Sequence, residues 1–149
     1  MTMRPCDPSQ HASYTTPWGI GVVVNREILP RFRLACERAA SEKWRPRRID
    51  SYVCRPVRGR VTPSRHAYAA AWDFFVTLPG VEPPGGIWTP EDPVPPEFAR
   101  HFERLGFRWG RRFPRRDDPH IEWPTNNVPP LSKAGSDEGW ERLQTPHDP

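Results

Sequence analysis

A short stretch, SRHAYAAAWDFFV at residues 64–76, decides how the chain folds. His66 lies seven residues before Asp73, which opens an apolar run. We predict a β-strand over residues 72–77, because aromatic and β-branched residues dominate this run. A carboxylate among Trp and Phe side chains is costly unless it is paired or bound to a cation. We therefore expect Asp73 to bind either a metal ion or one of the many arginines.

A second stretch, DDPHIEW at residues 117–123, places three carboxylates and a histidine within six residues. His120 and Glu122 are two residues apart, so on a strand they lie on the same face. Asp117 precedes His120 across a proline turn, where it can stand above a metal without binding it. Two neutral imidazoles and one carboxylate suit zinc, with a fourth position open for a water that ionises near neutral pH. We expect the two stretches to meet in space and to form the site of a zinc hydrolase.

The composition indicates one domain with stiff, irregular connections. The chain has 149 residues, of which 36% are hydrophobic, and it contains 21 prolines. A chain of this length can bury a sizeable core, and seven Trp and seven Phe residues supply bulky side chains for it.

The charge balance is mildly basic, with 22 basic and 18 acidic residues and a net charge of +4. Dedicated nucleic-acid binders usually show a larger excess, so we expect no nucleic-acid partner. Such a charge is typical of a solvated basic surface, and it also suits an anionic polymer such as a cell wall. No stretch approaches the ~20 apolar residues of a membrane span, and the N-terminus lacks the apolar region of a secretory signal. We expect a monomer made in the cytoplasm, which reaches any external substrate through release by another agent.

Three cysteines are widely spaced, and they form no CxxC pair that would indicate a thiolate zinc site. Cys36 falls on the apolar face of a predicted helix and Cys54 at the end of a predicted strand. Both are expected to be small core residues. A disulfide between two of Cys6, Cys36 and Cys54 stays open.

Helices and strands alternate without βαβ regularity, which favours an α+β fold with a small antiparallel sheet. The apolar patterns predict strands at 20–24, 49–54 and 72–77, and helices over 26–43 and 96–105. Asn25 is a plausible N-cap of the first helix.

Three parts of the chain are predicted to differ in organisation. Residues 1–16 are expected to form an irregular N-terminal arm, residues 17–124 the folded domain, and residues 125–149 a proline-rich C-terminal tail. Within the tail, residues 138–143 have a short helical pattern. The proline-rich segment 79–96 is a long loop, which either borders a substrate cleft or is a surface detour.

The ordered motifs resemble a known family. The sequence SxH at 64–66, then Asp73, then DxxHxEW at 117–123, resembles the zinc D-alanyl-D-alanine carboxypeptidases and L-alanyl-D-glutamate endopeptidases. These are peptidoglycan peptidases of bacteria and phage lysins. The lead-in segments CRP at 54–56 and GFRWG at 106–110 match as well. The resemblance implies a hedgehog-like metallopeptidase fold with the zinc site on the sheet.

The resemblance also implies roles for individual residues. The Zn²⁺ ligands would be His66, Asp73 and His120. Asp117 would be the general base, and Ser64 would contact the substrate. Glu122 would be a hydrogen-bond partner behind the ligands. Arg55 would neutralise the oxyanion or the substrate carboxylate, with Arg58 and Arg60 as alternatives. Trp109 and Trp123 are expected to pack around the site.

The implied substrates are peptidoglycan stem peptides, with the cleaved bond, L-Ala-D-Glu or D-Ala-D-Ala, left open. A phage lysin and a cell-wall remodelling enzyme both agree with the motifs. One alternative is a non-catalytic, zinc-stabilised wall-binding module. A metal-dependent nuclease is a further alternative, indicated by the arginine-rich turn at 111–116.

Two positions depart from the family pattern. Ala69 stands where the family usually has glycine, and Arg111 stands where a second glycine usually follows Trp109-Gly110. If residue 69 needs a positive φ, alanine costs roughly 1 kcal/mol there. Neither departure removes an expected ligand or the base.

Overall fold

The computed structural model describes residues 2–55, 57, 62–77 and 94–131. Its elements follow one another as 3-10 helix η1 (Pro8–Gln10), strands β1 (His11–Thr15) and β2 (Gly21–Asn25), helix α1 (Leu29–Ala39), strand β3 (Arg45–Asp50), 3-10 helix η2 (Arg65–Tyr68), strand β4 (Ala71–Thr77), helix α2 (Pro96–Glu103), strand β5 (Arg108–Trp109), 3-10 helix η4 (Gly110–Arg112) and strand β6 (His120–Glu122).

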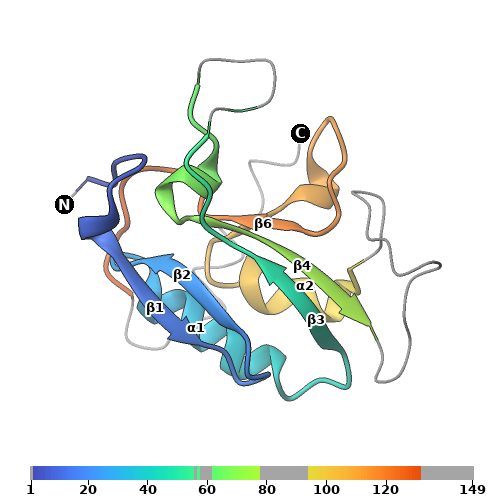
Figure 1. The fold of residues 1–149 in the computed structure, drawn as a ribbon. Helices are drawn as coiled ribbons and strands as arrows, with labels where there is room; N and C mark the ends of the chain where they lie inside the picture. Colours follow the sequence, from blue (N-terminus) through green and yellow to red (C-terminus); the bar gives the residue numbers. More distant parts are fainter. Residues whose placement is uncertain (1, 56, 58–61, 78–93, 132–149) are drawn as a thin grey trace.

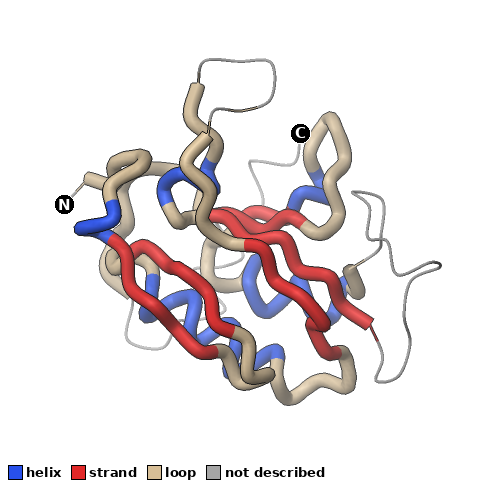
Figure 2. Tube along the Cα trace, viewed as in Figure 1, coloured by secondary structure: helices blue, strands red, loops and turns tan. Residues whose placement is uncertain are grey.

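The described strands form two small antiparallel sheets. Strands β1 and β2 pair as a hairpin, and the second sheet has the order β3-β4-β6-β5 (Figure 1). Strand β4 is central, and it pairs with segments from both halves of the described chain. The predicted α+β class with a small antiparallel sheet is confirmed (Figure 2).

The core lies on the helix-covered face of the larger sheet. Because successive strand residues point to opposite faces, Trp72 and Phe74 of β4 share this face. The ring of Phe32 in α1 lies 4.1 Å from that of Trp72 and 5.9 Å from that of Phe102 in α2, centroid to centroid. Burial of such side chains contributes about 1.5–3 kcal/mol each. Asp73, which lies between them in β4, therefore points to the opposite face of the sheet.

The first helix is shorter than the predicted range 26–43. Asn25 caps the turn before α1, where its Oδ1 accepts a hydrogen bond from the Glu27 backbone N–H at 3.0 Å, and Ile28 is the N-cap. Pro30 lies in the first turn, where a missing N–H costs little. In the second helix, Gly106 follows the last turn with φ of 99°, as expected of a C-terminal glycine.

The predicted strand 49–54 was wrong in position, because β3 runs from Arg45 to Asp50. Only Ile49 and Asp50 of that range pair with β4. After Asp50 the chain leaves the sheet, and its backbone bonds to the motif around His66 instead. One such bond joins the Val53 N–H to the His66 carbonyl at 3.4 Å.

The N-terminal arm is more ordered than expected. Residues 1–16 were predicted to be irregular, but they contain η1 and β1, and Met3 is fully buried. The Met3 N–H also donates to the carbonyl of Asn126, at the start of the proline-rich tail. The sequence did not indicate β1, because its polar and small residues form no apolar pattern. Residues 79–93 of the expected loop 79–96, and the helical pattern 138–143, lie outside the described residues.

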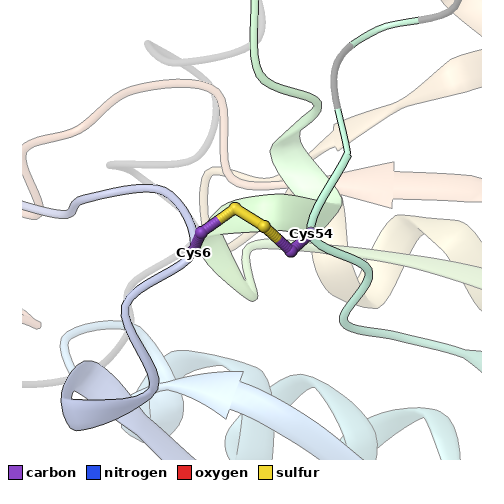
Figure 3. Close-up of a disulfide and its surroundings, with 2 residues drawn as sticks. All are labelled: Cys6 and Cys54. Carbon is purple, nitrogen blue, oxygen red and sulfur yellow. A yellow bond between two sulfur atoms is a disulfide. The ribbon is translucent and has the colours of Figure 1, made fainter.

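A disulfide joins Cys6 to Cys54, as Figure 3 shows, across a sequence separation of 48 residues. Cys54 is exposed, so its prediction as a core residue was wrong, whereas Cys36 is free and buried as expected. The bond ties the arm to the segment that follows β3.

Replacement of Cys6 by Ser should lower the free energy of unfolding by roughly 3–4 kcal/mol, because the unfolded chain loses a cross-link that closes a long loop. Chemical denaturation of the oxidised protein and of Cys6→Ser measures this difference. A phosphine reductant should destabilise the unaltered protein and leave Cys6→Ser unchanged. Equal stability of all three samples would contradict the expectation.

Candidate metal centre

His66 is positioned by η2, a single turn that Ser64 begins and Ala69 ends. The Ser64 Oγ accepts a hydrogen bond from the His66 backbone N–H at 3.2 Å, a typical N-cap. Ala69 has φ of 54°, in the left-handed region, and it turns the chain directly into β4. The side chain of His66 is then fixed by its Nδ1, which lies 2.8 Å from the carbonyl oxygen of Ser51.

Asp73 and His120 are neighbours on adjacent strands. They are register partners in the antiparallel pairing of β4 with β6, so both side chains stand on the face that the helices leave uncovered. The Asp73 Oδ1 lies 3.2 Å from the His120 Nδ1 and 3.4 Å from the His66 Nε2. One donor atom from each of the three residues lies within 4.8 Å of the others. The structure thus brings together the three side chains that the sequence singled out as ligands.

The outer hydrogen bonds leave a free lone pair on each imidazole. When His66 Nδ1–H donates to Ser51, the Nε2 lone pair points toward Asp73. When His120 Nε2–H donates to Glu122 Oε1, 2.7 Å away, its Nδ1 lone pair faces Asp73 as well. Histidine ligands of metals are oriented by such bonds from the other ring nitrogen. Two nitrogens and one carboxylate oxygen therefore converge on one point, which fits a divalent cation such as zinc.

The protonation states reflect this clustering. Burial acts to raise the pKa of Asp73, but its bonds to His120 and His66 outweigh burial and hold that pKa well below the usual range. Burial lowers the pKa of His120, yet its bonds to Asp73 and Glu122 prevail and raise it to about 10. Without a metal, His120 thus carries a proton at neutral pH between the two carboxylates. A cation at this site would take the place of that proton.

Asp117 stands beside the cluster. Its Oδ2 lies 4.0 Å from the His120 Nδ1, too far for a hydrogen bond, and its side chain is 41% exposed. Partial burial raises the pKa of Asp117 above its usual value. Its backbone is pinned to Gly110, whose carbonyl accepts from the Asp117 N–H at 2.9 Å. A Cβ at Gly110 would lie 2.1 Å from the Asp117 carbonyl oxygen, so only glycine permits this close approach.

Residues 58–123 match a family model described as D-alanyl-D-alanine carboxypeptidase. This match confirms the predicted family resemblance. The matched region covers just under half of the chain, and the lead-in segment CRP at 54–56 lies outside it. Searches of curated proteins and of solved structures find no match to the chain.

The carboxypeptidase-like region contains the whole donor cluster, Asp117 and Glu122. This family match, together with a triad that can hold a metal, supports a peptidoglycan-acting metallopeptidase in general. No helix in the described part of the chain has the length and hydropathy needed to cross a membrane.

The structure gives less direct evidence on the other predicted site residues. Ser64 caps η2 and donates its backbone N–H to the carbonyl of Arg55 at 3.1 Å, so the two residues are neighbours in space. Arg55 is exposed, whereas Arg58 and Arg60 lie outside the described residues. Trp109 and Trp123 are buried, as the predicted packing role requires.

Asp118 was missed by sequence reasoning, although it is the most buried carboxylate near the donor cluster. Its side chain has no exposed surface and is bound by Arg116 and Arg111, while its carbonyl accepts from the Trp109 indole at 2.7 Å. Buried carboxylates need such partners. Arg111, one of the two departures from the family, thus fixes the residue next to Asp117. The sequence feature that could have indicated these contacts is the arginine-rich turn just before the acidic pair Asp117-Asp118.

Replacement of Ala69 by Gly should raise the free energy of unfolding by up to about 1 kcal/mol, because alanine is strained at the positive φ found there. Thermal and denaturant unfolding of the two proteins measure the change. A lower stability of Ala69→Gly would mean that packing of the buried methyl group outweighs the backbone strain.

Zinc binding should strengthen as pH rises from 6 to 8, by up to about tenfold per pH unit, with release of one proton. The reason is the raised pKa of His120, which keeps this imidazole protonated in the metal-free protein throughout that range. Titration calorimetry in buffers of different ionisation enthalpy counts the released protons. An affinity that stays constant with pH, without proton release, would contradict the assignment.

Proposed function

We propose that the protein is a zinc metallopeptidase that hydrolyses peptide bonds in peptidoglycan stem peptides. The convergence of His66 Nε2, Asp73 Oδ1 and His120 Nδ1, with Asp117 beside them, is the observation that carries this proposal. The family match supports a peptidase of this kind. Both D-Ala-D-Ala and L-Ala-D-Glu bonds are candidate targets.

His66, Asp73 and His120 would hold the ion, each fixed by a hydrogen bond or by strand pairing. Zn²⁺ held there would supply Lewis-acid chemistry for peptide hydrolysis near neutral pH. Glu122 keeps the His120 ring in the tautomer that presents Nδ1 to the ion. This bond supports its proposed role as a partner behind the ligands.

Asp117 would act as general base. It stands near the donors without bonding to them, and a raised pKa brings its proton affinity closer to that needed at neutral pH. The carboxylate would take the proton from the attacking water and later pass it to the leaving amine. Its partial exposure leaves it open to both.

Substrate contacts are proposed at the segment that holds Arg55 and Ser64. Arg55 would balance the negative charge of the oxyanion or of a substrate carboxylate, because its guanidinium is exposed next to the turn that carries His66. Ser64 would present its hydroxyl to the peptide in addition to capping η2. The peptidase domain is proposed to span residues 17–124, between the arm and the tail. Its place of action would be the cell wall, reached by release during phage lysis or by non-classical export.

Replacement of His120 by Ala should abolish zinc binding, whereas Asp117→Ala should bind zinc and lose at least about 100-fold in turnover, the usual contribution of a general base. Zinc content after dialysis and the rate of peptide release from peptidoglycan measure the two effects. Full activity of Asp117→Ala would contradict its role as base and make Glu122 the next candidate.

Mass spectrometry of digested peptidoglycan identifies the bond. Free D-alanine would identify a carboxypeptidase, and stem peptides that begin at glutamate would identify an endopeptidase. A His120→Ala digest is the control for contaminating hydrolases. If walls of several chemotypes yield no zinc-dependent product, the proposed peptidase activity is wrong and a wall-binding module takes its place.

A further inference from the structure

The three donor residues are held in place by different structural elements. Asp73 and His120 are fixed to each other by strand pairing, because they are register partners on β4 and β6. His66 lies outside the sheet, on the four-residue turn η2. Metal–ligand bonds of about 2.0–2.1 Å tolerate little error, so the position of η2 relative to β6 must also be set.

Arg65, the residue before His66, reaches from η2 to the end of β6. Its Nε donates to the carbonyl of Trp123 at 3.0 Å, its Nη2 to the carbonyl of Thr125 at 2.7 Å, and its Nη1 to the Asn126 Oδ1 at 2.6 Å. Trp123 directly follows Glu122, the partner of His120. One guanidinium thus links the residue next to His66 with the residue next to the His120–Glu122 pair.

The surroundings of Arg65 hold the guanidinium in a fixed orientation. Its central carbon lies 4.1 Å from the centroid of the Tyr68 ring, which is on the same turn, so cation–π contact adds to the three hydrogen bonds. The residue is partly buried, so its guanidinium is held among these partners. A planar fork with several donors suits such a role better than the single ammonium of lysine.

We propose that Arg65 is a positioning residue of the metal site, which sets the distance from His66 to Asp73 and His120 by clamping η2 to the 123–126 segment. The inference rests on the proposed zinc site. A clamping role and a purely electrostatic role of Arg65 predict opposite changes in zinc affinity when this residue is replaced. Loss of a nearby positive charge by itself favours cation binding, whereas loss of the clamp disfavours it.

Arg31 offers a matched control, because it makes the same kinds of contact without touching η2. Its guanidinium donates to the carbonyls of Leu105, Pro129 and Pro130, and it lies 5.0 Å from the centroid of the Trp123 ring. Both arginines therefore fasten the chain after β6, and either loss should reduce stability. Only the Arg65 contacts involve the turn that carries His66.

The experiment compares Zn²⁺ dissociation constants of the unaltered protein, Arg65→Gln, Arg65→Lys and Arg31→Gln, by competition with a chromophoric chelator at a temperature where all four are folded. We expect Arg65→Gln to bind zinc about 10–100-fold more weakly, the usual cost of losing an outer partner of a ligand. Arg31→Gln should stay within about twofold of the unaltered protein. Arg65→Lys should also be weakened, because lysine keeps the charge but cannot make three bonds in fixed directions.

Three results would overturn the positioning role alone: unchanged or tighter zinc binding by Arg65→Gln, full restoration by Arg65→Lys, or equal weakening in Arg31→Gln. Failure of the unaltered protein to bind zinc would overturn the proposed metallopeptidase, and with it a role defined by the metal donors. The Arg65 and Arg31 variants therefore test the positioning role, whereas the unaltered protein tests the zinc site itself.

Discussion

The antiparallel pairing of β4 with β6 is the constraint on which the rest of the structure depends. It sets Asp73 opposite His120, although 47 residues separate them in the sequence. The alternation of β4 then places Trp72 and Phe74 in the core and Asp73 on the opposite face. Core packing and metal-donor geometry therefore share one strand. A one-residue slip in this pairing would turn Asp73 into the aromatic core and dismantle both at once.

Around Asp73 and His120, separate interactions orient the donor side chains. The Ser51 carbonyl and Glu122 select the tautomers of the two histidines, and Ala69 accepts backbone strain so that η2 can turn into β4. Gly110 lets the chain pass close enough to hold Asp117 beside the donors. Strain and buried charge at these positions are costs that the aromatic core offsets, as is usual where a fold supports a reactive site.

Much of this site could be predicted from the sequence, because its signals are local. Strand alternation places His120 and Glu122 on one face, and Asp73 among aromatic residues needs a partner. The full ligand set and the role of Asp117 came from the family resemblance of the motifs. The disulfide from Cys6 to Cys54 could not be predicted, since pairing among three cysteines depends on the three-dimensional path of the arm. Likewise, Arg65 and Asp118 read as ordinary surface charges in the sequence. Their roles arise from contacts with residues such as Trp123 and Arg116 that only the folded chain brings near.

The central claim is that two imidazole nitrogens and one carboxylate oxygen of this cluster bind zinc. X-ray absorption at the zinc edge of the loaded protein tests it most directly, because it reports the type and distance of the coordinating atoms. The expected result is a shell of nitrogen and oxygen atoms at about 2.0–2.1 Å, with two of the scatterers showing the outer-shell pattern of imidazole. A sulfur ligand at about 2.3 Å, or a protein that retains no zinc, would contradict it.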